Sequence, residues 1–253
     1  MVSMPGKEAL SQKPRSQVTR PWITRLPRLT PGRRALRWIV RWLARLLTFL
    51  LTRTSITGLQ NLPPRGPALL VFNHLGDADV VVWAAHSPLI VETMGKAEIL
   101  DFPLIGRLMD AYGVIWVHRG QPDRAALRSV FEAFAEGRMV AIAPEARESL
   151  TGSLEVGTGG AAYLSLKAEV PVVPITFTGT ENRRVYGNLK RFHRTRITVT
   201  VGKPFWLASL PDFRLAVERG TETIMQKLAA QLPVEYRGIY NLETEEDSAR
   251  SRK

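Results

Sequence analysis

Short apolar runs rich in valine and isoleucine alternate with longer stretches of helical periodicity from residue 68 onward. The apolar runs predict strands at 68–72, 89–94, 113–118, 139–144, 172–179 and 196–202. The stretches between and after them predict helices at 78–86, 104–111, 123–136, 160–168 and 212–231. Alternating strands and helices, with strands that are apolar throughout, predict an α/β single domain with a largely parallel central sheet flanked by helices.

Residues 36–51, LRWIVRWLARLLTFLL, have a different pattern, in which nearly every position is apolar. The basic positions recur every fourth residue, as Arg37, Arg41 and Arg45. We interpret 36–54 as an N-terminal amphipathic, membrane-associating helix, with its arginines at the lipid headgroups and Trp38 and Trp42 at the boundary. It is too short and too charged to span a bilayer well, which takes about 20 apolar residues. An ordinary core helix whose arginines extend to solvent is the alternative.

The net charge of +12 is concentrated near the N-terminus. Residues 1–53 hold 12 Lys and Arg against one acidic residue, whereas the other 200 residues hold 23 basic and 22 acidic side chains. A nearly neutral body gives nucleic acid little to bind, and the basic segment favours anionic lipid. The chain has no cysteine, which excludes disulfides, thiolate zinc sites and a cysteine nucleophile.

Polar side chains follow four of the predicted strands. Asn73-His74, Lys96, His118-Arg119 and Pro144-Glu145-Ala146-Arg147 each stand where a strand ends. Because ligand sites in parallel sheets lie at the carboxyl ends of strands, we expect these groups to converge on one site. Ordinary polar loop starts are the alternative.

The first of these groups belongs to VFNHLGDADVVV, residues 71–82. A histidine beside a carboxylate is a typical general-base pair. Because the sequence has no G-x-S-x-G elbow, a substrate hydroxyl is a better candidate nucleophile than an enzyme serine. The nearby cations would bind a phosphate or carboxylate. Spacing alone leaves open whether His74 uses Asp77 or Asp79.

The segment His74-Leu-Gly-Asp-Ala-Asp79 resembles the H-x4-D signature of the glycerolipid acyltransferases, whose best-known members are the lysophosphatidic acid (1-acyl-sn-glycerol-3-phosphate) acyltransferases. Three further segments resemble other blocks of the family in the family's order. They are KAE (96–98), GVIWVHR (113–119) and VPVVP (170–174). The resemblance covers residues 55–205.

The resemblance implies that His74 takes the proton from a free hydroxyl of a lysophospholipid, which then attacks the thioester of acyl-CoA or acyl-carrier protein. Asp79 would orient the histidine, and Asp77 would then serve the N–H groups of the first helical turn. The expected acceptor is lysophosphatidate, converted to phosphatidate in phospholipid synthesis. Residues expected to bind the acceptor are Lys96, Arg119, Glu145 and Arg147. No metal or organic cofactor is implied.

The third block departs from the family pattern. The family usually has E-G-T-R-S, whereas this chain has Glu145-Ala146-Arg147-Glu148-Ser149. If the family glycine has a positive φ, Ala146 is strained or the loop differs. A carboxylate at 148 would repel a phosphate if it pointed inward. The same chemistry on another lipid or a glycolipid acceptor therefore stays an alternative.

These observations give a domain organisation. Residues 1–35 form a basic, disordered or loosely attached segment, 36–54 the interfacial helix, 55–235 the acyltransferase domain, and 236–253 a polar tail. We expect a peripheral or monotopic protein on the cytoplasmic face of the cell membrane, with membrane lipids and the acyl donor as partners and without nucleic acid or metal. A non-catalytic basic membrane-binding protein is the rival from another class. Basic residues at 183–196 would contact headgroups, CoA or carrier protein, or form a solvated loop.

Overall fold

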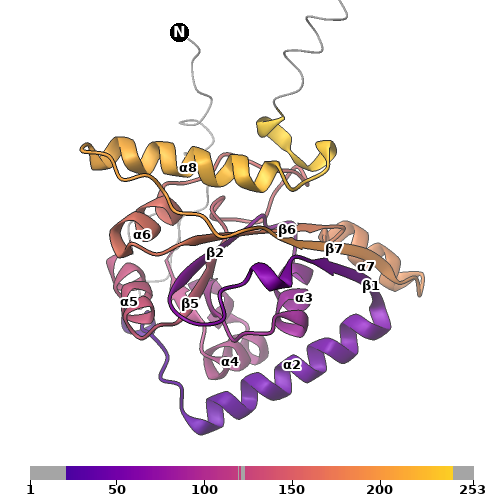
Figure 1. Cartoon of the computed structure of the whole chain (residues 1–253). Helices are drawn as coiled ribbons and strands as arrows, with labels where there is room; N and C mark the ends of the chain where they lie inside the picture. Colours follow the sequence, from indigo (N-terminus) through magenta and orange to yellow (C-terminus); the bar gives the residue numbers. More distant parts are fainter. Residues whose placement is uncertain (1–20, 119, 121–122, 242–253) are drawn as a thin grey trace, which may run out of the picture.

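A seven-stranded sheet runs through the computed structural model, which describes residues 21–118, 120 and 123–241 (Figure 1). The strands are β1 (Thr52–Thr57), β2 (Ala68–Phe72), β3 (Glu92–Lys96), β4 (Ile115–Val117), β5 (Met139–Ile142), β6 (Val172–Thr178) and β7 (Thr195–Val201). Their order is β1-β7-β6-β2-β5-β3-β4. Neighbouring strands are parallel except for β6 and β7. The prediction of a largely parallel α/β sheet is confirmed.

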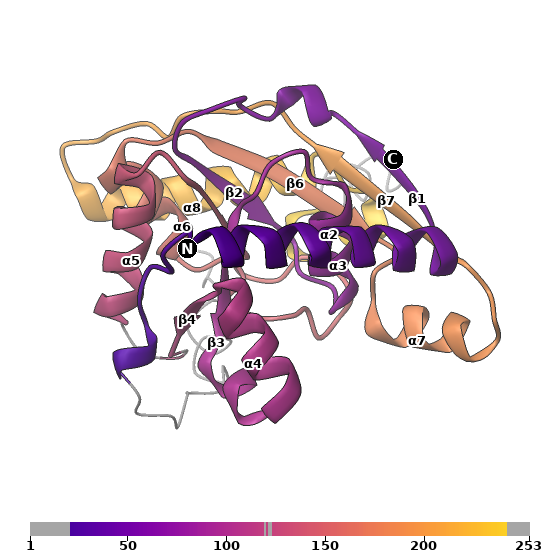
Figure 2. The same cartoon turned by 90° about the horizontal axis from the view of Figure 1, so that it is seen from below.

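Helices cover both faces of this sheet (Figures 1 and 2). The α-helices are α2 (Pro31–Leu51), α3 (Ala78–His86), α4 (Pro103–Tyr112), α5 (Arg124–Ala135), α6 (Gly160–Ala168), α7 (Asn182–Lys190) and α8 (Phe213–Ala229). Short 3-10 turns lie at η1 (Pro21–Ile23), η2 (Leu59–Asn61), η3 (Ala97–Asp101), η4 (Val234–Tyr236) and η5 (Gly238–Tyr240). Helices α5, α6 and α8 lie over one face, and α3 lies over the other with α2 outside it.

Strand β2 shows why the sequence gives this layering. Leu69 and Val71 belong to the core that includes α5, α6 and α8, whereas Ala68 and Leu70 belong to the core that includes Val82 of α3. Successive side chains of a strand point to opposite faces, so an unbroken apolar run is buried on both sides. Strand β2 is therefore a central strand with a helical layer on each side.

Helix α2 begins and ends earlier than predicted. The Thr30 side chain accepts a hydrogen bond from the Arg33 N–H at 3.3 Å, and Pro31 is the first helical residue, so both favour a start at this point. The helix ends at Leu51, and residues 52–54, which we assigned to it, belong to the edge strand β1. This polar, threonine-rich strand lacks the apolar run that identified the other strands.

The arginine stripe of α2 bonds to the domain, and for Arg37, which is buried, the predicted contact with headgroups is wrong. Arg37 is buried and forms a two-pronged ion pair with buried Glu92, at 3.0 and 2.7 Å. Arg41 donates to the carbonyl of Ser87, and Arg45 donates to that of Ala85 at 2.8 Å. The stripe therefore attaches α2 to the domain.

The remaining faces of α2 are apolar and exposed to solvent. Their large exposed side chains are Trp38, Ile39, Trp42, Leu43, Leu46, Leu47, Phe49, Leu50 and Leu51. The exposed apolar surface is therefore wider than that of a helix whose arginines point outward. In the described ranges, no helix combines the length and apolarity needed to cross a membrane.

Other element boundaries differ from the sequence prediction in small ways. Strand β3 begins at Glu92 rather than at residue 89, and Ile90 is exposed. The basic segment taken as a possible loop contains α7. Tyr236 and Tyr240, assigned to the polar tail, pack against the core. Asp123 caps α5, since its side chain accepts from the Ala126 N–H at 3.0 Å. The predictions for 1–20 and 242–253 lie outside the described residues.

Candidate active site

His74 lies between the end of β2 and the start of α3, where its ring meets Asp79. The distance from His74 Nδ1 to Asp79 Oδ2 is 2.8 Å. The same carboxylate oxygen accepts from the backbone N–H groups of Leu75 and Gly76, at 2.8 and 3.1 Å. Asp79 is 1% exposed. The turn before α3 thus folds the Asp79 carboxylate back onto the imidazole. Of the two aspartates that the spacing left open, His74 uses Asp79.

The side chain of Asp77 makes a different contact from the one we predicted. It is the N-cap residue of α3 but makes no capping hydrogen bond with its side chain. Its Oδ2 instead accepts from the Tyr186 hydroxyl at 2.8 Å, and its backbone N–H donates to Asn182 Oδ1 at 2.9 Å. The predicted capping role of Asp77 is therefore wrong, and both of its described contacts are with α7.

The surroundings of His74 favour its protonated form. Burial lowers the pKa of the imidazole, but the hydrogen bond to Asp79 and the charges of Asp79, Glu148 and Glu145 together raise it above its ordinary value. The side chain keeps 21% of its surface exposed, so the ring can be reached from solvent. With Nδ1 engaged by Asp79, Nε2 is the nitrogen that can accept a substrate proton.

Glu145 lies beneath this pair and is 1% exposed. Its Oε2 accepts from the His74 backbone N–H at 3.3 Å, and its Oε1 accepts from the Glu155 N–H at 2.6 Å. Burial raises the pKa of this carboxyl to about 7 against the lowering effect of those two N–H groups. Glu145 thus connects the backbone of β2 to the loop after β5. Its predicted contact with an acceptor stays a prediction.

The loop of residues 146–149 follows β5 and contacts the turn from His74 to Asp79. Ala146 has φ of 59°, so this chain holds alanine in the left-handed conformation that a glycine adopts more easily. Arg147 donates Nε and Nη2 to Glu155 Oε2, at 2.9 and 2.5 Å. The Ser149 N–H donates to the His74 carbonyl at 2.7 Å. The altered third block is therefore fixed to the histidine.

The structure brings two of the four predicted strand-end groups together, since Glu145 after β5 accepts from the backbone N–H of His74 after β2. Convergence of all four groups on one site stays a prediction. Strands β2, β5, β3 and β4 are consecutive in the sheet and parallel, so the groups that follow them lie along one edge. Lys96 ends β3 with an exposed side chain. Arg119 lies outside the described residues. His118 instead pairs with Asp123, whose Oδ2 lies 2.9 Å from its backbone N and 3.1 Å from its Nδ1.

Helix α7 contributes side chains that the sequence analysis did not single out. Asn182 donates Nδ2 to Glu148 Oε2 at 3.1 Å, in addition to its contact with Asp77. Tyr186 lies one turn further along the same helix. The sequence pattern indicated the basic residues of this segment. In the structure its neutral residues Asn182 and Tyr186 contact Asp77, in the turn from His74 to Asp79. No short-range pattern links residues so distant in the chain.

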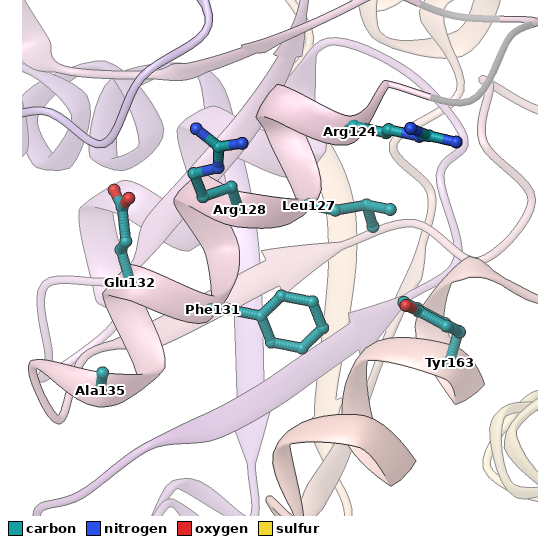
Figure 3. Close-up of a pocket in the computed structure, with 7 residues that line it drawn as sticks. All are labelled: Arg124, Leu127, Arg128, Phe131, Glu132, Ala135 and Tyr163. Carbon is teal, nitrogen blue, oxygen red and sulfur yellow. The ribbon is translucent and has the colours of Figure 1, made fainter.

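A separate groove lies along α5 and α6, and its lining contains none of the predicted site residues (Figure 3). The Phe131 ring points toward Tyr163, with ring centroids 6.2 Å apart, and Arg124 and Arg128 lie along the same helix. In residues 21–118, 120 and 123–241, no group of three or more His, Asp and Glu could hold a metal ion.

Comparison with known proteins identifies the family. The model of the acyltransferase family matches residues 53–178, which include His74, Asp79 and Glu145 but end before α7. The chain belongs to the acyltransferase family. A 1-acyl-sn-glycerol-3-phosphate acyltransferase from Brassica napus is 30% identical over 157 residues, covering 61% of this chain and 45% of that protein. A lyso-ornithine lipid O-acyltransferase from Pseudomonas aeruginosa is 32% identical over 116 residues, 46% of this chain and 44% of that protein.

The chain thus aligns with about half the length of these curated relatives. A solved structure with the same fold is that of the 1-acyl-sn-glycerophosphate (LPA) acyltransferase PlsC from Thermotoga maritima. It superposes with a TM-score of 0.58 over 80% of this chain and 84% of that one, at 17% identity. The α/β acyltransferase fold predicted from the sequence is therefore confirmed.

Proposed function

We propose that this acyltransferase transfers an acyl group from a thioester to a free hydroxyl of a lysophospholipid. Lysophosphatidate, converted to phosphatidate, is the first acceptor to consider because most of the similar proteins are named for that reaction. Another lipid or a glycolipid acceptor is the alternative, and the name of the Pseudomonas relative supports a different lysolipid. The donor is acyl-CoA or acyl-carrier protein, and we expect no cofactor.

The observation that carries this proposal is the pairing of His74 with Asp79, which leaves His74 Nε2 free to act as a base. In the proposed reaction, Nε2 takes the proton of the acceptor hydroxyl, and the oxygen attacks the thioester carbonyl. The tetrahedral adduct collapses with cleavage of the C–S bond, and the imidazolium returns its proton to the leaving thiolate. The Asp79 carboxylate stabilises the imidazolium in between.

Incubation of the purified chain with acyl-CoA and lysophosphatidate tests the reaction. A colorimetric thiol assay measures the released CoA, and mass spectrometry identifies the product. If acyl-CoA fails, acyl-carrier protein is the second donor. His74→Ala should lower turnover by about 10³-fold or more because the base is lost. The Glu132→Gln variant, altered on the exposed side of α5, controls for handling. Turnover that survives His74→Ala would remove the histidine from the mechanism.

Membrane contact through the exposed face of α2 completes the proposal, with the cytoplasmic face of the cell membrane as the expected side. Large apolar side chains beside a basic segment favour binding to anionic lipid. The double change Trp38→Ser and Trp42→Ser should reduce co-sedimentation with vesicles of anionic phospholipid. Trp206→Ser, at an equally exposed tryptophan elsewhere, is the matched control. Equal binding of all three proteins would contradict the role of α2.

These experiments also separate the enzyme from a non-catalytic membrane-binding protein. Under the enzyme hypothesis, His74→Ala loses acyl transfer but still binds vesicles, because none of the hydrogen bonds and ion pairs described for His74 involves α2. Absence of acyl transfer from the unaltered chain with every donor and lysolipid would favour the non-catalytic alternative.

A further inference from the structure

A carboxylate faces the reactive side of the catalytic histidine. Glu148 Oε1 lies 4.0 Å from His74 Nε2, the nitrogen assigned to accept the substrate proton. The glutamate side chain is 37% exposed, so solvent and a bound acceptor can reach its carboxylate. An acceptor hydroxyl in hydrogen-bond reach of Nε2 must therefore lie next to this carboxylate.

Contacts on both sides fix Glu148 in this position. Asn182 of α7 donates to its Oε2 at 3.1 Å, which leaves Oε1 directed at the imidazole. The next residue, Ser149, is held to the His74 carbonyl by its own N–H at 2.7 Å. The glutamate thus has a defined place relative to the base rather than a free surface position.

The charges that the structure describes around this position are mainly negative. Within the described ranges, no lysine or arginine forms an ion pair with Glu148. The cation nearest in sequence, Arg147, is engaged by Glu155. Neither Arg147 nor another described lysine or arginine therefore neutralises the Glu148 carboxylate. Its negative charge acts on the group that an acceptor carries beside its hydroxyl.

We infer that Glu148 determines acceptor specificity, favouring a lysolipid that carries an ammonium group near the reacting hydroxyl over one that carries a phosphate there. The inference rests on the proposed acyl transfer and narrows its acceptor. Lysophosphatidate then becomes the poorer substrate of the two classes. Charges a few ångströms apart at a partly exposed site change relative rates by roughly tenfold.

The basic residues of α7 offer the opposite outcome. Arg183 and Arg184 follow Asn182 directly and are exposed, so they are two cations on α7 that could attract an acceptor phosphate to this side. If they govern specificity, removal of the Glu148 charge leaves the ranking of acceptors unchanged. The experiment therefore measures a ratio of two acceptors rather than one rate.

The test compares kcat/KM of the full chain for three acceptors with one acyl donor. The acceptors are lysophosphatidate, lyso-ornithine lipid and lyso-ornithine lipid whose ammonium has been acetylated. Glu148→Gln should lower the ratio of lyso-ornithine lipid to lysophosphatidate about tenfold, and Glu148→Arg should lower it about a hundredfold. The acetylated lipid should lose most of the advantage that the ammonium gives in the unaltered chain. Glu132→Gln controls for removal of a distant charge.

Asn182→Ala tests the positioning of the glutamate. This variant should lower the same ratio in the same direction, by about threefold, and should add little to Glu148→Gln in the double variant. A purely structural role of Asn182 would instead lower activity on all three acceptors equally.

A ratio that stays within about twofold of the original in both Glu148 variants would overturn the inference while leaving acyl transfer intact. An unaltered chain that prefers lysophosphatidate over lyso-ornithine lipid, with a preference that does not increase in Glu148→Gln, would overturn it as well. An unaltered chain that acylates none of the three lipids would overturn the proposed function, and the inference with it.

Discussion

Replacement of Asp79 by Asn can separate the charge of this residue from its hydrogen bonds. Oδ2 accepts from the His74 ring, Leu75 N–H and Gly76 N–H, while the buried Oδ1 has no hydrogen-bond partner in the described part of the chain. An asparagine that places its carbonyl oxygen at the Oδ2 position can therefore keep all three bonds. The charge is removed and an amide NH2 takes the place of the unpartnered Oδ1, whereas alanine removes the bonds as well.

The magnitude follows from the separation of the two charges. A carboxylate and an imidazolium about 4 Å apart interact by about 4 kcal/mol at an effective dielectric constant of about 20. The loss of this stabilisation corresponds to a decrease of about 10³ in kcat as an upper limit. Asp79→Asn should thus fall between the unaltered enzyme and Asp79→Ala, with a loss of about 10²-fold to 10³-fold.

Thiol release from acyl-CoA, measured from pH 5 to pH 9, gives the rate and its pH dependence together. Because the Asp79 charge raises the pKa of His74, its removal should move the acidic limb of kcat/KM to lower pH. Asp77→Asn, which contacts Tyr186, is the matched control and should change kcat by less than about threefold. Activity of Asp79→Asn equal to that of the unaltered enzyme would refute charge stabilisation and leave orientation alone.

Three further predictions concern stability. Ala146→Gly should raise the free energy of unfolding by about 0.5–1 kcal/mol, because relief of the left-handed alanine exceeds the added chain entropy; a lower urea midpoint would contradict this. Arg37→Ala should lower the free energy of unfolding by about 3–5 kcal/mol, because it leaves the buried Glu92 carboxylate without its main partner. Arg45→Ala, which loses a hydrogen bond to a carbonyl, should lower it by about 1 kcal/mol. Similar losses in the two variants would argue against the ion pair. Because the pKa of Glu145 rises from 4.5 to about 7 on folding, its stabilising contribution is complete below pH 4.5 and is lost as the pH rises through 7, by about 3 kcal/mol. The raised pKa of His74 acts in the same direction. The free energy of unfolding, measured with urea, should therefore be lower at pH 8 than at pH 5, and this difference should be smaller in Glu145→Gln.

The sequence predicted the elements whose physics is local or repetitive. Apolar runs located most of the central strands, because a strand covered on both faces must be apolar at every position. The parallel order then placed His74 and the third block at one edge of the sheet. Edge strand β1 escaped because it is exposed on alternate positions and made of threonine and serine. Its identity depends on pairing with β7, about 140 residues later.

The candidate site was predictable to the extent that its residues are close in the chain. The turn from His74 to Asp79 is short, and the family resemblance selected the correct aspartate. The contacts of Glu148 with His74 and Asn182 join three separate segments, and no spacing rule relates them. The direction of the α2 arginines was missed for the same reason, since Glu92 is 55 residues away from Arg37.

The ion pair between Arg37 and Glu92 joins helix α2 to the buried first residue of β3. A surface helix attached in this way cannot rotate about its own axis without breaking a buried charge pair. Adsorption of its apolar side to a bilayer would therefore set the tilt of the whole domain and the height of His74 above the lipid. Acceptor length, measured from headgroup to hydroxyl, would then be selected by geometry before any contact in the site is made.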